Sequence, residues 1–186
     1  MDEDRNVTTL GEQIAALPVD PRLGRMLLAA TRHNCLTEML IIAAFLEAQD
    51  PRERPAEAQQ HAAQQHATFA DKRSDFITVL NLWRLYGEQA AALSRNQLRK
   101  WCREHFLSSM RMREWQDLHA QLADAISELK LRPNQVEASY AELHQAILTG
   151  FLGSIGHLDE RREYDGPRGL RFVIAPGTPL ASRPPK

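Results

Sequence analysis

Hydrophobic side chains recur at the three- and four-residue spacing of amphipathic helices along most of the chain. Short polar segments separate these periodic stretches, as the connections of a helical bundle would. The pattern predicts two short helices between Thr9 and Thr31, followed by helices over residues 34–46, 74–86, 94–107, 112–129 and 135–148. The expected fold class is therefore mainly α, a helical bundle.

Residues with strong local preferences mark where several of these helices begin and end. Pro18 ends the first helix, because a proline pushes the residue before it out of the α region. Asp20 and Pro21 are the preferred residues at the cap and first position of the second helix. Ser94 and Gln97 have the spacing of a capping box, so a helix is expected to begin there.

The segment 56–70 differs from its neighbours because it has almost no large apolar residue. It follows a charged connector, residues 49–55 (QDPRERP), and is rich in alanine, glutamine and histidine. Helix propensity is high, so we expect a solvated helix or a mobile lid. His61 and His66 are five residues apart, which places them on different helix faces and argues against a shared metal ion.

The character of the chain changes at Gly150. Glycines become frequent, and residues 154–157 and 170–174 have the composition of β-strands, with Asp165 and Gly166 between them as turn residues. Two or three short strands cannot form an independent core. They either pack against the helices or begin a β domain that is incomplete.

Composition adds few constraints. The chain has 186 residues, of which 43% are hydrophobic and 25% charged, and a formal net charge of -1, so overall charge indicates no nucleic-acid partner. No apolar run reaches the roughly 18 residues of a membrane-spanning helix, and the N-terminus is too polar for a secretory signal. We expect a cytoplasmic protein that does not bind membranes.

Motifs for enzyme chemistry are missing from the sequence. It has no GxxxxGK[ST] loop for phosphates, no GxGxxG, no HExxH and no GxSxG. Cys102 and His105 are three residues apart and could form a nucleophilic pair, but Cys102 falls on an apolar helix face, where thiols are usually inert. The sequence therefore predicts no catalytic residue and no metal site.

Two stretches are locally basic despite the neutral total. Each carries six cations against two carboxylates, one between Arg95 and Trp115 and the other from Arg161 to the end. The first also contains Trp101 and Trp115, and cations beside aromatic rings are typical of single-strand binding surfaces. A solvated face with core tryptophans, and a disordered basic tail, remain open as simpler interpretations. The candidate nucleic-acid contacts are Arg99, Arg103, Arg111, Arg161, Arg162, Arg168 and Arg171.

Several segments, in order, resemble the C-terminal accessory region of the DEAH-box ATP-dependent RNA helicases, and of their bacterial HrpA-type branch in particular. Residues 10–27 (LGEQIAALPVDPRLGRML) resemble the end of that family's winged helix. The ratchet domain is represented by residues 41–46 (IIAAFL), 74–83 (SDFITVLNLW) and 101–107 (WCREHFL). Residues 172–178 (FVIAPGT) resemble a strand and turn of its OB-fold.

The resemblance implies three parts: the end of a winged helix over 1–33, a helical ratchet domain over 34–149 and an incomplete OB-fold over 150–186. It also implies an accessory module that grips single-stranded RNA, or DNA, while RecA-like motor domains, absent here, hydrolyse ATP with Mg²⁺. On this interpretation the chain is a piece of a larger helicase, inactive alone and without a cofactor of its own. The alternative is a free-standing helical module that binds a partner protein and no nucleic acid.

Overall fold

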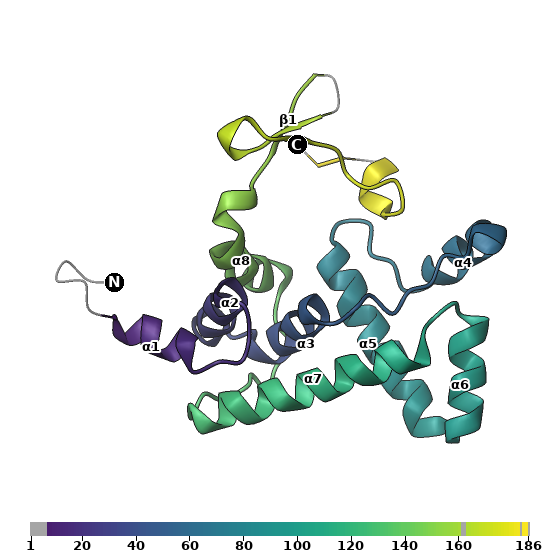
Figure 1. Ribbon diagram of the computed structural model, residues 1–186, viewed down its shortest axis with the longest axis horizontal. Helices are drawn as coiled ribbons and strands as arrows, with labels where there is room; N and C mark the ends of the chain where they lie inside the picture. Colours follow the sequence, from purple (N-terminus) through teal and green to yellow (C-terminus); the bar gives the residue numbers. More distant parts are fainter. Residues whose placement is uncertain (1–6, 161–162, 183, 186) are drawn as a thin grey trace. The chain divides into compact units, whose positions relative to one another are not determined.

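The computed structural model describes residues 7–160, 163–182, 184 and 185, and confirms the mainly helical prediction. Short 3-10 turns, η1 (Ala56–Ala58), η2 (Leu152–Ser154), η3 (Pro167–Gly169) and η4 (Pro179–Ser182), join the larger elements. The α-helices are α1 (Thr9–Ala15), α2 (Pro21–Arg32), α3 (Leu36–Glu47), α4 (Gln59–His66), α5 (Asp75–Ala92), α6 (Arg95–Glu104), α7 (Ser109–Glu128) and α8 (Tyr140–Phe151) (Figure 1).

The predicted helix starts are confirmed by their capping hydrogen bonds. The Asp20 carboxylate accepts from the backbone N–H of Arg22 at 2.9 Å, with Pro21 at the first helical position of α2. At α6, the Gln97 side chain accepts from the backbone N–H of Ser94 at 3.0 Å and completes the capping box. Each cap satisfies backbone groups that a helix end leaves without an internal partner.

The described residues fall into two compact units, each built from two stretches of sequence. Unit 1 comprises the described part of Met1–Gln49 together with Glu114–Leu152, and unit 2 comprises Asp50–Arg113 and the described part of Gly153–Lys186. The three-part division at residues 33 and 149 stays a prediction.

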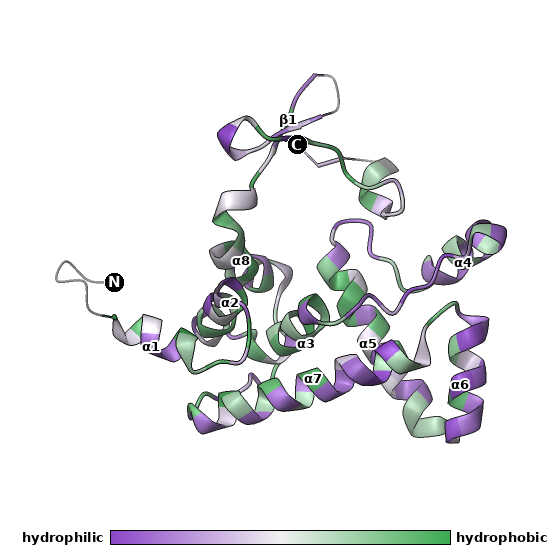
Figure 2. Ribbon diagram, in the orientation of Figure 1, coloured by the Kyte–Doolittle hydropathy of each residue, from purple (hydrophilic) through white to green (hydrophobic). Residues whose placement is uncertain are grey.

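The core of unit 1 lies where α2 packs along α8 and α3 (Figure 1). Nearly every side chain of α3 between Leu36 and Ala44 is buried, and Figure 2 colours this helix mostly hydrophobic. Gly150 allows α8 to approach α2 closely, since a Cβ there would lie 2.7 Å from the Arg22 carbonyl oxygen. Because α3 is apolar on nearly all sides, it has to be enclosed by neighbouring helices, and the packing in unit 1 provides this enclosure.

Trp115 of α7 is a central side chain of unit 1. It is fully buried, and its indole Nε1 donates to the backbone carbonyl of Ile41 at 2.9 Å. The Phe45 ring meets it edge to face, with centroids 5.1 Å apart. Trp115 should contribute strongly to stability, because it buries a large apolar area and its one polar atom is hydrogen-bonded.

A buried carboxylate ties the segment before α8 to α3. Glu38 is 6% exposed, and it accepts hydrogen bonds from the Asn134 amide at 2.9 Å and from the backbone N–H of Ala138 at 3.0 Å. The Asn134 amide oxygen in turn accepts from the backbone N–H of Thr37 at 2.8 Å. A buried charge requires such partners, because an unpaired one would be strongly destabilising.

In unit 2, the connector before α4 pairs with the turn after α6. The backbone N–H of Glu53 donates to the Phe106 carbonyl, and that of Ser108 donates to the Pro51 carbonyl, both at 2.8 Å. The β-bridge between Arg52 and Leu107 lies at the centre of this pairing. The charged connector predicted from the sequence is therefore held as an ordered, extended segment.

The end of unit 2 forms a small antiparallel sheet of three two-residue strands in the order β1-β2-β3, namely β1 (His157–Leu158), β2 (Tyr164–Asp165) and β3 (Arg171–Phe172). The strand expected over 154–157 is wrong in position, because α8 continues into η2 through Ser154. Tyr164 is buried, stacks on Phe172 at 5.3 Å and donates its hydroxyl hydrogen to the Pro185 carbonyl at 2.6 Å. Whether this sheet is part of an OB-fold stays a prediction.

Within the described residues, no helix combines the length and apolar character that crossing a lipid bilayer requires.

Candidate nucleic-acid interface

The outer side of α6 is strongly basic. Cys102 is buried on the inner side, and Figure 2 shows the helix as mostly hydrophilic. The exposed cations, which we call the α6 basic face, are Arg95, Arg99, Lys100 and Arg103. Lys100 has a 3.8 Å ion pair with Glu104, in which both side chains are well exposed, so solvent and salt screen it. Two of the predicted contacts, Arg99 and Arg103, thus lie together on an accessible surface.

The tryptophans of this stretch do not form an open stacking platform. Trp115 is enclosed in the core of unit 1, as the simpler sequence interpretation expected. Trp101 is half-buried; its ring stacks on His105 at 4.3 Å and lies 6.4 Å from the ring of Tyr86. The basic face of α6 therefore offers charge rather than a row of free aromatic faces.

Arg111 has a structural partner. Its side chain is half-buried, and Nη1 donates to the backbone carbonyl of Asp50 at 3.2 Å. It thereby fixes the start of the connector that pairs with residues 106–108. The environment of Arg111 therefore differs from that of the exposed pair Arg99 and Arg103. The role of Arg111 in nucleic-acid contact stays a prediction.

The two cations of the basic tail that the structure describes, Arg168 and Arg171, are both exposed, but they differ in their partners. Arg168 is exposed and has a backbone φ of 59°, in the left-handed region of a turn. Arg171 is ion-paired with Asp165 at 3.3 Å and Glu163 at 3.8 Å, which offsets part of its charge. Arg161 and Arg162 lie outside the described residues.

Neither cysteine has the environment of a nucleophile. Burial raises the pKa of the Cys102 thiol to about 11, and burial, with smaller contributions from Glu38 and Glu142, raises that of Cys35 to about 12. His105 is engaged by its Nδ1 with the Trp101 carbonyl at 2.8 Å. A thiol that stays protonated near neutral pH is a poor nucleophile, which favours the inert interpretation.

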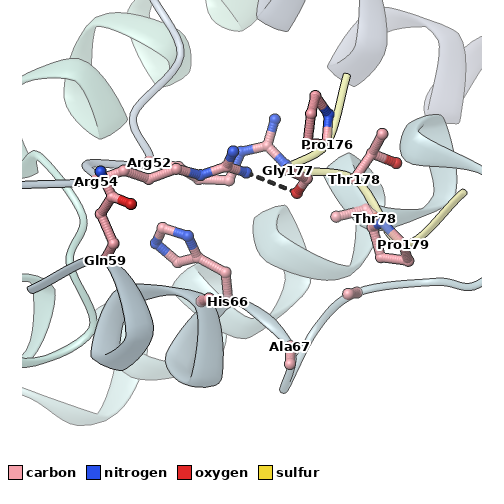
Figure 3. A pocket seen from close by; sticks show the side chains of 12 residues that line it. Arg52, Arg54, Gln59, His66, Ala67, Thr78, Pro176, Gly177, Thr178 and Pro179 are labelled. Atoms are coloured by element: carbon pink, nitrogen blue, oxygen red, sulfur yellow. Dashed lines mark hydrogen bonds between the residues drawn. The ribbon is translucent and has the colours of Figure 1, made fainter. Parts of the chain in front are cut away.

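A second positively charged feature of unit 2 is a cavity that sequence reasoning did not find. Its volume is about 540 Å³. Apolar parts of its wall come from Ala63, Ala67, Ala70 and the loop 176–179, and its two charged lining residues are Arg52 and Arg54 (Figure 3). We call it the Arg52–Arg54 cavity. The lining includes no carboxylate, although Asp50 and Asp75 lie just outside it.

The two arginines of this cavity are held in different ways. The Arg52 guanidinium makes a bidentate pair with the Asp50 carboxylate, with a closest N–O distance of 2.7 Å. Partial burial works to raise the pKa of Asp50, but the hydrogen bonds from Arg52 outweigh it, so this pKa lies below its usual value. Arg54 instead donates through Nη2 to the carbonyl oxygen of Gly177 at 3.1 Å (Figure 3).

His66 forms part of the floor of the same cavity. Its side chain comes from α4 and lies beneath the two arginine side chains (Figure 3). Nε2 lies 3.1 Å from the Phe106 carbonyl oxygen, and because a carbonyl only accepts, Nε2 carries the hydrogen. Nδ1 is then an acceptor, and it is buried without a hydrogen-bond partner among the described residues. Burial lowers the pKa of His66, and Arg54 and Arg52 lower it further.

The sequence interpretation of α4 missed this role of His66. The expected solvated helix is present, but its inner side, with His66 at 7% exposed, is buried. The segment lacks large apolar residues, so periodicity gave no sign of an inner face. The two arginines in the QDPRERP connector were the available signal. No set of three or more potential metal ligands comes together in the parts of the chain that the structure describes.

Residues 20–79 match the family described as helicase associated domain (HA2), ratchet-like. The match begins at the cap of α2 and ends within α5.

Similarity to individual proteins extends over nearly the whole chain. It is 48% identical over 181 residues, 97% of its length, to the ATP-dependent RNA helicase HrpA of Escherichia coli, and 45% over 185 residues, 99%, to the HrpA homolog of Haemophilus influenzae. It is also 33% identical over 122 residues, 66% of its length, to the pre-mRNA-splicing factor ATP-dependent RNA helicase prp22 of Schizosaccharomyces pombe. The predicted resemblance to HrpA-type helicases is confirmed. The chain spans 14% of each bacterial relative and 10% of the yeast one.

Proposed function

We propose that this chain is an RNA-contacting accessory module of a DEAH-box ATP-dependent RNA helicase. The observation that carries the proposal is the 48% identity to an RNA helicase over almost the entire chain, 97% of its length. In this role the module holds single-stranded RNA while RecA-like motor domains hydrolyse ATP with Mg²⁺. No ATP-binding motif occurs in the chain, so we expect hydrolysis to belong to those motor domains.

The α6 basic face is the contact surface that we favour. Arg99 and Arg103 are four residues apart and exposed on one side of the helix, a spacing that lets both reach neighbouring phosphates. Binding through guanidinium and phosphate is electrostatic, so it depends strongly on salt and weakly on base sequence. Arg168 and Arg171 of the C-terminal sheet region are secondary candidates, with Arg171 weakened by its two carboxylate neighbours.

Fluorescence anisotropy with a labelled ten-nucleotide oligouridylate, measured over a series of salt concentrations, tests this surface. Replacing both Arg99 and Arg103 by glutamine should make the negative slope of log affinity against log salt shallower by about 1.4, since each phosphate contact on a single strand contributes about −0.7. The control is the double variant Arg25→Gln with Arg132→Gln, which removes two exposed cations elsewhere. Equal slopes for the two double variants would contradict the assignment.

A docking role toward a protein partner is the second candidate. It is favoured by exposed apolar side chains at the end of α8 and in η2, where Leu148 is 44% and Leu152 58% exposed. Clusters of exposed large apolar residues often mark protein contacts. If the chain binds a partner protein and no RNA, replacing Leu148 and Leu152 by serine should abolish that binding in a pull-down with the motor domains of the same helicase. The α6 variant should then have no effect.

A further inference from the structure

We propose that the Arg52–Arg54 cavity binds one nucleotide, with the phosphate at Arg54 and a hydroxyl or amino group of the ligand at Nδ1 of His66. The cavity lies wholly within unit 2, and it is separate from the α6 basic face. The inference does not depend on the proposed function. It rests on three observations: the cavity, the N–H donors of Arg54 that have no protein partner among the described residues, and the buried Nδ1 of His66, which lacks a hydrogen-bond donor.

Size and wall chemistry favour a small organic ligand. A volume of about 540 Å³ falls in the range of about 300–1,000 Å³ that is usual for small-molecule and cofactor sites. Ala63 of α4, Ala67 and Ala70 just after it, and the two prolines of the loop 176–179 supply apolar walls against which a sugar or base can lie. Such a lining, with a small number of polar groups, is the usual composition of a ligand site.

Arg54 is suited to a phosphate because its guanidinium retains donors. Its hydrogen bond to a protein group among the described residues is the one to the Gly177 carbonyl. A guanidinium has five N–H donors in a planar fork that matches two phosphate oxygens. Arg52 adds a second positive charge, but its bidentate pair with Asp50 leaves Arg54 as the principal phosphate ligand.

His66 supplies the second recognition group. Its Nδ1 needs a donor, because a buried acceptor without a hydrogen bond is destabilising. Inorganic phosphate keeps a hydroxyl hydrogen at neutral pH, but an ion of its size would leave most of the cavity of about 540 Å³ empty. The phosphate group of a nucleotide is a monoester with a second pKa of about 6, so above about pH 7 it is mainly a dianion that offers Nδ1 no donor. A ribose hydroxyl or a base amino group carried by the same molecule would satisfy it, which is why the proposed ligand is a nucleotide.

The loop 176–179 forms one wall of the cavity. Hydrogen bonds at two of its residues, Gly177 and Thr178, hold it against the rest of unit 2. Gly177 accepts from Arg54, and the Thr178 hydroxyl donates to the Asp75 carboxylate at 2.9 Å. Gly177 has no Cβ that would collide with the guanidinium of Arg54. Gly177→Ala therefore displaces the Arg54 head group while retaining its charge, which tests position independently of charge.

Isothermal titration of the complete chain with uridine 5′-monophosphate, with inorganic phosphate as the second probe, tests the site. We expect Arg54→Gln and Gly177→Ala to weaken nucleotide binding by about tenfold or more, because a charge-assisted hydrogen bond is lost or misplaced. The double variant Arg25→Gln with Arg132→Gln, which removes two exposed cations outside both candidate sites, should leave it unchanged. In nuclear magnetic resonance spectra, the ¹⁵N signal of His66 Nδ1 should shift with the nucleotide and stay constant with phosphate.

The source of the nucleotide is settled by comparing the free monophosphate with the ten-nucleotide RNA. Binding of the monophosphate that is lost in Arg54→Gln supports a free nucleotide. Arg54-dependent binding of RNA without binding of the monophosphate supports a nucleotide unit of a strand. The proposal is overturned if neither ligand depends on Arg54, or if phosphate binds as tightly as the nucleotide. Because the α6 variants report on the proposed function separately, either idea can fail without the other.

Discussion

The core of unit 1 and the C-terminal sheet of unit 2 differ greatly in how much of their surface they bury. In α3, eight of the nine residues from Leu36 to Ala44 are buried, the exception being Thr37. In the three strands Tyr164 is the one buried residue. Burial of apolar surface is the main favourable term in folding, so the two regions cannot contribute equally to stability. The sheet therefore depends on a few directed contacts, whereas the helices depend on packing.

The largest effect is expected from removing the central side chain of unit 1. Trp115→Ala should lower the free energy of unfolding by about 3–5 kcal/mol, the usual cost of truncating a buried aromatic residue. The Ile41 carbonyl would also lose its indole donor. Chemical denaturation measures the change, and Met110→Ala on the same helix is the control, since Met110 is 72% exposed. Similar effects of the two variants would show that packing in unit 1 does not dominate.

A smaller loss is expected where unit 1 uses polar contacts. Asn134→Ala removes the amide that donates to Glu38 and the oxygen that accepts from Thr37. Leaving a buried carboxylate short of a partner should cost about 1–3 kcal/mol. Denaturation again reports the value, with Asn96→Ala on the exposed surface of α6 as the control. A change below about 0.5 kcal/mol, the usual range for surface substitutions, would mean that water replaces the amide.

A third effect concerns pH and the helical part of unit 2. Burial lowers the pKa of His66, so the folded state binds its proton less readily than the unfolded state. The contribution of neutral His66 to stability is therefore fully present above the unfolded-state pKa of about 6.5. This contribution is lost as the pH falls below that value towards the lower pKa of the folded state. The slope of the unfolding free energy against pH should be at most about 1.4 kcal/mol per pH unit for this one group.

The variant His66→Gln should reduce that slope between pH 7 and 5, measured by denaturation at each pH. Gln60→Ala on the exposed side of α4 is the control for a change in that helix without loss of a titratable group, and it should leave the slope unchanged. Burial also lowers the pKa of His119 in unit 1, so part of the slope should persist in the His66 variant. An unchanged slope in His66→Gln would mean that this histidine is protonated equally in both states.

Much of the helical architecture was predictable because its signals are local. Periodicity and the caps at Asp20 and Ser94 determine the helices through bonds within a few residues. The features that could not be predicted from the sequence depend on partners that are far apart along the chain. Arg54 meets Gly177 across 123 positions, and His66 meets Phe106 across 40, so no local pattern reports them. The exposed cations of α6 were found because helical spacing separates them from Cys102, whereas the partner of Arg111 was not foreseeable.

The smallest effect on the stability of the whole chain should come from the C-terminal sheet. Tyr164→Ala removes the buried strand residue, its stack on Phe172 and its hydrogen bond to Pro185. We expect the unfolding free energy of the whole chain to change by less than about 0.5 kcal/mol, because regions with little buried apolar contact open locally without global unfolding. Amide hydrogen exchange should show early loss of protection in β2 and β3, while α2 and α3 stay protected. The variant Tyr140→Ala is the control, as Tyr140 lies on α8 and is 37% exposed. If Tyr164→Ala also accelerates exchange in α3, the sheet and the core of unit 1 unfold as one cooperative body and the contrast between them does not hold.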